Sequence, residues 1–170
     1  LHGCAVSSLT TVLSGYTKKY RNYTPQKVRD VVEKKVFGTA VWNKNYSKTI
    51  MKQMPVSMYG ISRVLESVGI DTKYVRTYTN KSARKEIKKH LKTGNVVVIE
   101  TNNRTQRTDT GKVIVADSSQ RKWSGQNQRI KYTTVKEIVK YMIPCTSSVK
   151  THYFSSTANS GGYVLVNPQD

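Results

Sequence analysis

The sequence predicts an α+β domain in which an N-terminal helical layer packs on a mostly antiparallel sheet. Its length of 170 residues corresponds to one domain. Apolar residues at helical spacing come first along the chain, and most of the strand-like segments follow. An order of helices and then strands is typical of this fold class. We therefore expect a single domain over residues 1–170.

The first part of the chain contains three predicted helices. Residues 4–16 carry apolar side chains at three- and four-residue spacing, and a glycine near the end favours helix termination. Residues 24–38 begin with Thr-Pro, a cap residue followed by proline at the first helical position. Residues 56–69 give a third helix, which a glycine ends. The polar segment 39–55 is expected to be a loop or a short broken helix that borders a cleft.

The second part contains the predicted strands. Residues 70–77 alternate as a strand, and residues 80–92 form a basic helix ended by a Thr-Gly-Asn turn. The apolar run VVVIE at 96–100 and the segment 112–117 are further strands, and residues 134–142 are a last helix. The expected core is 2–143. A C-terminal extension, 144–170, contains the run YVLVN, which we expect to add an edge strand.

The chain is strongly basic. Lys and Arg number 29 against 10 Asp and Glu, a formal net charge of +19. Nucleic acid, anionic lipid headgroups and phosphate-bearing bacterial wall polymers fit such a charge equally well. The basic residues are spread along the chain, without a dense tail or a nucleic-acid motif. We therefore expect a solvated basic surface, possible contact with an anionic wall or membrane, and no nucleic-acid partner.

Other classes of protein are excluded by what the sequence lacks. The longest apolar run has far fewer than the roughly 18 residues of a membrane-spanning helix, so an integral membrane protein is excluded. Cys4 and Cys145 allow at most one disulfide and match no zinc or redox spacing, so we expect no metal. Because the chain begins at Leu1 without an export signal, we expect a mature or trimmed form.

Cys4 is the residue that most favours a chemical role. It follows Gly3 and opens the first predicted helix. A thiol at a helix N-terminus faces free backbone N–H groups and the positive end of the helix dipole, and both favour the thiolate. The same N–H groups could hold an oxyanion during acyl transfer. The alternative is that Cys4 is a small buried apolar residue.

Five segments carry a resemblance to a known family, in the same order and over most of residues 2–143. They are HGCAVSSLTTVLSGY, YGISRVLESVGI, HLKTGNVVVIE, TDTGKVIVADSS and TTVKEIV. Together they resemble the bacteriocin-processing-type, double-glycine-peptidase-like cysteine peptidases of the papain-like fold. The resemblance implies the papain-like fold, with Cys4 as the nucleophile and Asp117 as the carboxylate that orients the catalytic histidine. It implies no metal and no other cofactor.

The general base of this family is missing. The family has a histidine in a pattern like H-x-x-V-L-x-G between the VVVIE-like and KVIVAD-like strands, whereas here Glu100 leads through TNNRTQR directly into TDTGKVIVAD. Either a segment has been omitted near Arg107 and Thr108, or the protein is an inactive relative. We favour omission, because losing a strand would leave its neighbour unpaired. The family's oxyanion-hole glutamine, upstream of Leu1, cannot be assigned either.

The three histidines of the sequence are weak substitutes. His2 is close to Cys4 in sequence but sits at the chain end, His90 lies among lysines and is expected to be solvated, and His152 does not match the family's pattern. Trp42, Tyr46, Met58 and Trp123 are candidate groove residues, and filling the core and the loops is the alternative role for them.

We therefore expect a cysteine peptidase or amidase that hydrolyses peptide bonds through a thioester. We expect it at the bacterial cell surface or outside the cell. An inactive papain-like module that binds a peptide or an anionic wall polymer is the alternative. A nucleic-acid binder is the weakest interpretation, because the sequence lacks an aromatic-plus-basic motif.

Overall fold

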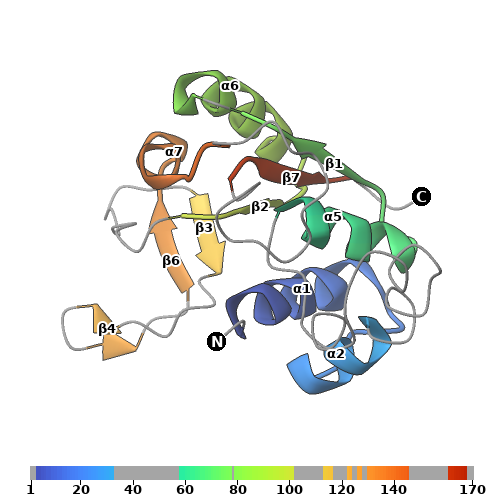
Figure 1. Cartoon of the computed structure of the whole chain (residues 1–170). Helices are drawn as coiled ribbons and strands as arrows, with labels where there is room; N and C mark the ends of the chain where they lie inside the picture. The colour runs from blue at the N-terminus through green and yellow to red at the C-terminus, as the bar shows by residue number, and fades with distance from the viewer. Residues whose placement is uncertain are drawn as a thin grey trace.

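The computed structural model describes residues 3–32, 58–77, 79–101, 113–116, 122–123, 126–127, 130–145 and 161–167. Its elements are, in chain order, α1 (Gly3–Tyr16), α2 (Pro25–Val32), α5 (Met58–Ser67), β1 (Thr72–Val75), α6 (Asn80–Leu91), β2 (Val97–Ile99), β3 (Val113–Ala116), β4 (Lys122–Trp123), β5 (Gln126–Asn127), β6 (Ile130–Thr133), α7 (Val135–Tyr141) and β7 (Tyr163–Val166) (Figure 1). The α+β class is confirmed. The predicted loop at 39–55 lies outside the described residues.

The main sheet has the strand order β1-β7-β2, and both pairings are antiparallel. Thr72 lies opposite Val166, and Val97 lies opposite Leu165. The expectation that YVLVN forms an edge strand is therefore wrong, because β7 is the central strand. All four residues of β7 are buried, as is typical of a strand that is covered on both faces.

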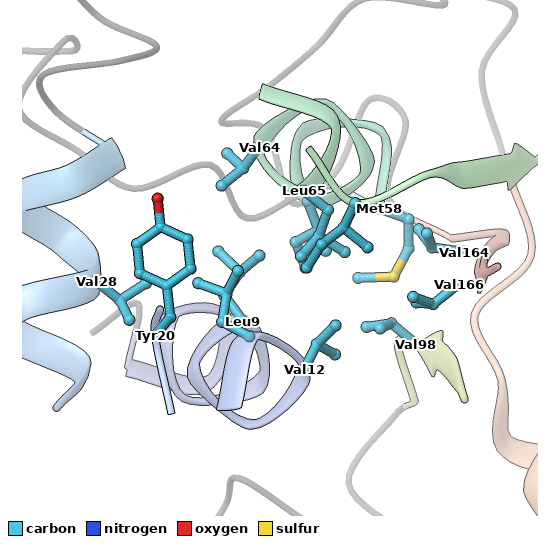
Figure 2. Close-up of a cluster of buried hydrophobic side chains, with 13 residues drawn as sticks. Leu9, Val12, Tyr20, Val28, Met58, Val64, Leu65, Val98, Val164 and Val166 are labelled. Atoms are coloured by element: carbon cyan, nitrogen blue, oxygen red, sulfur yellow. The ribbon is translucent and has the colours of Figure 1, made fainter. Parts of the chain in front are cut away.

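Helices cover both faces of this sheet. Val164 and Val166 of β7 point into a core formed with α1, α2 and α5 (Figure 2). Tyr163 and Leu165 point to the other face, where they pack with α6 and α7. The expected N-terminal helical layer is present, but a second layer lies opposite it. It is needed because β7 and β2 are apolar on both sides, so each face of the sheet has to be shielded from water.

The ends of the helices follow local chemistry. The turn after α5 contains Gly69 with a φ of 89°, and the turn after α6 contains Gly94 with a φ of 80°. Both values lie in the left-handed region that glycine adopts without a steric cost. At the start of α7 the side chain of Thr134 accepts a hydrogen bond of 3.2 Å from the backbone N–H of Glu137. The predicted stops at residues 69 and 94 are confirmed.

Two smaller antiparallel pairs accompany the main sheet. β3 pairs with β6 from Val113 opposite Thr133 to Ala116 opposite Ile130, and β4 pairs with β5. An isolated antiparallel bridge between Thr101 and Met142 joins the end of β2 to the residue that follows α7. The segment predicted at 112–117 is thus a strand, as expected.

Two glycines lead the chain into β7. Gly161 has a φ of 97° and Gly162 a φ of 75°. A Cβ atom at residue 161 would lie against the backbone carbonyl of Pro144, and one at residue 162 would lie against the carbonyl oxygen of Val75. The N–H of Gly162 donates a hydrogen bond of 3.1 Å to the carbonyl of Ile143. Side chains are therefore excluded here both by backbone conformation and by space.

Alanine variants of Gly94 and Gly161 separate the cost of a positive φ from the cost of a close backbone contact. We expect Gly94→Ala to lower the free energy of unfolding by about 1–2 kcal/mol, because it carries only the cost of a positive φ; nothing lies within 4 Å of a Cβ at that position. Gly161→Ala should cost several kcal/mol more, because the added methyl group also meets the Pro144 backbone. Urea unfolding of both variants measures the difference, and equal losses would contradict the close approach.

Candidate functional site

Cys4 is the second residue of α1, at the N-terminal end of a helix of 14 residues. The first four N–H groups of an α-helix have no carbonyl partner within the helix. The expected position of Cys4 at a helix N-terminus is therefore confirmed for its backbone, while its side chain lies outside the described residues. The thiol is therefore attached where a helix has N–H donors without intrahelical partners and the positive end of its dipole.

The rest of α1 is firmly held. Leu9, Val12 and Leu13 are buried in the core that faces α2, α5 and the sheet (Figure 2). At the other end of the helix, the hydroxyl of Tyr16 donates to Oδ1 of Asn95 at 3.2 Å and accepts from the N–H of Val96 at 2.9 Å. These contacts tie α1 to the segment that enters β2. The helix that carries Cys4 is thus fixed relative to the sheet.

Asp117, the predicted orienting carboxylate, follows β3 directly and lies outside the described residues. The strand before it is described, and its last residue, Ala116, pairs with Ile130. In the view of Figure 1 the arrowhead of β3 points toward the end of α1 that carries Cys4. The pairing of Asp117 with a histidine beside Cys4 stays a prediction.

His90 has a different environment from the one expected. Its Nε2 lies 2.9 Å from the carbonyl oxygen of Val166, and the residue is half-buried rather than a solvated surface side chain. A carbonyl only accepts, so Nε2 carries the proton in this contact. His90 belongs to α6, on the opposite face of the sheet from α1. It is therefore not positioned to take a proton from Cys4. His2 and His152 lie outside the described residues.

None of the described strands contains a histidine. The full sequence joins Arg107 directly to Thr108, so the expectation that a segment with the histidine is omitted there is wrong. The central strand β7 is preceded by Gly161 and Gly162 rather than by a histidine. The Pro144 backbone leaves no room for a side chain at Gly161. β7 is thus an apolar strand without an imidazole at its start.

The candidate groove residues are only partly described. Met58 is 4% exposed and packs in the core beside α1, so its role is to fill the core rather than to line a groove (Figure 2). Trp123 lies in β4, but its side chain is not among those described. Trp42 and Tyr46 lie outside the described residues.

A cluster that the sequence analysis did not identify surrounds the entry to β7. We call it the junction cluster; it consists of Tyr74, Glu100, Cys145, Gly161 and Gly162. The hydroxyl of Tyr74 lies 3.6 Å from Sγ of Cys145 and 3.5 Å from the carbonyl of Gly161. The N–H of Gly161 donates to Oε2 of Glu100 at 3.1 Å. A Gly-Gly pair in front of an apolar run was the available signal for it.

The junction cluster has a structural role. Cys145 is 3% exposed and free, so it is not bonded to Cys4. Structural cysteines that are buried are inert. Burial raises the pKa of the Glu100 carboxyl above its ordinary value, and the hydrogen bond from Gly161 offsets part of that effect. The cluster joins the ends of β1 and β2 to the start of β7.

The described part of the chain shows neither a metal-binding cluster nor a helix that could cross a membrane. Its residues include no group of three or more His, Cys, Asp or Glu side chains that could hold a metal ion. None of its helices has the length and apolar character needed to cross a membrane. Comparisons of the chain with protein-family models, with curated proteins and with solved structures found no match.

The raised pKa of Glu100 predicts a pH dependence of stability. Between its ordinary pKa and the higher folded-state pKa, the folded protein binds more protons than the unfolded chain, so stability falls as pH rises through this window. We expect Glu100→Gln, which keeps an acceptor for Gly161, to be more stable relative to the natural protein at pH 7 than at pH 4. Urea unfolding at both pH values tests this.

Asp30→Asn is the control for this experiment, since it removes an exposed carboxylate from α2. A Glu100→Gln variant whose relative stability is the same at both pH values would contradict the burial of a charged carboxyl at the junction cluster.

Proposed function

We propose that the chain is a papain-like cysteine peptidase or amidase that acts on peptide bonds. The observation that carries the proposal is the position of Cys4 in the first turn of α1, a long helix whose remaining length is held in the core. Nucleophilic cysteines need surroundings that favour the thiolate, and a helix N-terminus provides them. The order of the five family-like segments adds support.

In the proposed reaction, the thiolate of Cys4 attacks the carbonyl carbon of the substrate. Backbone N–H groups at the start of α1 stabilise the oxyanion, and the leaving amine takes a proton from an imidazolium as a thioester forms. Water then hydrolyses the thioester. Asp117 is the proposed partner of the imidazole. Since His90 lies on the other face of the sheet, His2 and His152 are the histidines of the sequence that remain as candidates for the base.

An inactive binding module is the second candidate, and a specific observation favours it. The family pattern has its histidine between the VVVIE-like and KVIVAD-like strands, and the sequence has no histidine between Glu100 and Val113. In this case the same fold would hold a peptide or an anionic wall polymer without cleaving it. For either candidate we propose an extracellular or cell-surface location on a bacterial cell.

The reactivity of Cys4 is the first test. At pH 6.5 we expect iodoacetamide to alkylate Cys4 at least tenfold faster than free cysteine, because a larger share of its thiol is ionised. Cys145 provides an internal control: it is buried and should react only after unfolding. Peptide mapping by mass spectrometry measures both rates in one sample. A Cys4 rate equal to that of free cysteine would contradict an activated nucleophile.

Variants of the histidines separate the two candidates. We expect Cys4→Ala to abolish hydrolysis of a mixed peptide library and either His2→Ala or His152→Ala to lower it at least 100-fold. His90→Ala should retain turnover, since its ring is bonded to Val166, and should lose only stability. Loss of hydrolysis in Cys4→Ala together with full activity in both histidine variants would refute this assignment of the base. Activity that survives Cys4→Ala would refute the thiol mechanism.

A further inference from the structure

The outer side of α6 carries a dense row of positive charge. Its exposed basic side chains, with that of the C-cap residue, are Lys81, Arg84, Lys85, Lys88, Lys89 and Lys92. Because Ala83 and Ile87 of the same helix are buried against the sheet and α7, the basic residues are left on the side that faces solvent. The row extends over the whole length of the helix.

A second helix widens this row into a face. α7 packs beside α6, and its Lys136 and Lys140 are exposed. We call these residues of α6 and α7 together the α6–α7 basic face. It forms the outer layer on one side of the sheet, away from α1 (Figure 1).

Few acidic groups offset this charge. Glu86, the acidic residue of α6, accepts a hydrogen bond of 2.9 Å from the hydroxyl of Tyr163 and lies 3.8 Å from Nζ of Lys73. Glu137 lies in the first turn of α7, where it suits the helix dipole. The basic side chains that point outward from α6 therefore add up to a strong local positive potential.

We propose that the α6–α7 basic face binds the surface of an anionic phospholipid bilayer. The charges are spread in two dimensions across neighbouring helices, which matches a planar array of phosphates better than a single polymer chain, which would contact one row. The inference goes beyond the proposed hydrolase and holds equally for an inactive module.

The binding would be electrostatic, without insertion. The apolar side of α6 is already used against the sheet, so this helix has no free apolar face to enter the acyl region. Among the described residues, the exposed large apolar side chains are limited to Val96, which follows the turn after α6. Tyr141, the aromatic residue of α7, is half-buried and its ring already lies 5.3 Å from Nζ of Lys140, which argues against stacking on the bases of a single-stranded nucleic acid.

The test is co-sedimentation of the full chain with vesicles. We expect binding to vesicles of about 70% phosphatidylcholine and 30% phosphatidylglycerol in low salt, loss of that binding in 0.5 M NaCl, and no binding to pure phosphatidylcholine. Binding that persists in 0.5 M NaCl, or that is equal for both vesicles, would overturn the proposal.

A pair of matched variants locates the binding face. Arg84→Gln/Lys85→Gln/Lys88→Gln removes three charges from the basic face, and Lys18→Gln/Lys19→Gln/Arg21→Gln removes the same types and number of exposed charges from the region between α1 and α2. We expect the first variant to lose about 100-fold in vesicle affinity and the second less than about fivefold. Equal losses would show a general effect of net charge and refute a defined face.

Two further measurements control for the folding of the variants and for binding to other polyanions. Thermal unfolding followed by circular dichroism checks that both variants fold; if the first does not, Lys88→Gln/Lys92→Gln replaces it, with an expected loss of at least tenfold. Duplex DNA and soluble polyphosphate, added at the same phosphate concentration as the lipid, should compete weakly. Stronger binding to either one than to the vesicles would overturn the assignment to a bilayer.

Discussion

The pairing of β7 with two strands at once is the constraint on which the described structure depends. β1 and β2 are not neighbours of each other; each is held in the main sheet by its hydrogen bonds to β7. Alternate residues of β7 also enter the two cores on either side of the sheet. Further bonds fix its ends: Glu100 accepts from Gly161, and Asn167 donates through its side chain to Asp71 at 2.7 Å. Without β7, the strands β1 and β2 would lose their partner in the main sheet, and the two helical layers would lose the strand on which both pack.

The helices were predictable because their signals are local. Apolar spacing in α1, the Thr134 cap of α7 and the glycines at 69 and 94 act over a few residues, and a sequence displays them directly. The central place of β7 depends on pairing between residues as far apart as Thr72 and Val166, which no local pattern specifies. One clue was present: YVLV is apolar at every position, whereas an edge strand that is open to water on one face alternates.

The candidate site was likewise predictable only where its signals are local. That Cys4 begins a helix follows from nearby residues, and the prediction for its backbone was confirmed. The environment of His90 was predicted wrongly, because the lysines around it in sequence point outward while its own ring reaches the last residue of β7. The junction cluster was missed because its members come from β1, β2, β7 and the segment after α7. Such a cluster exists only when these parts have come together.

The proposed hydrolase site and the proposed membrane-binding face lie on opposite faces of the sheet. α1, which carries Cys4, covers one face together with α2 and α5, while α6 and α7 cover the other with their basic side chains outward. A domain resting on a bilayer through α6 and α7 would therefore hold the helix of Cys4 on its far side, separated from the lipid by the sheet. Charge on the basic face would then raise the local concentration of the protein at the membrane. In that orientation, a peptide substrate would approach from the aqueous side.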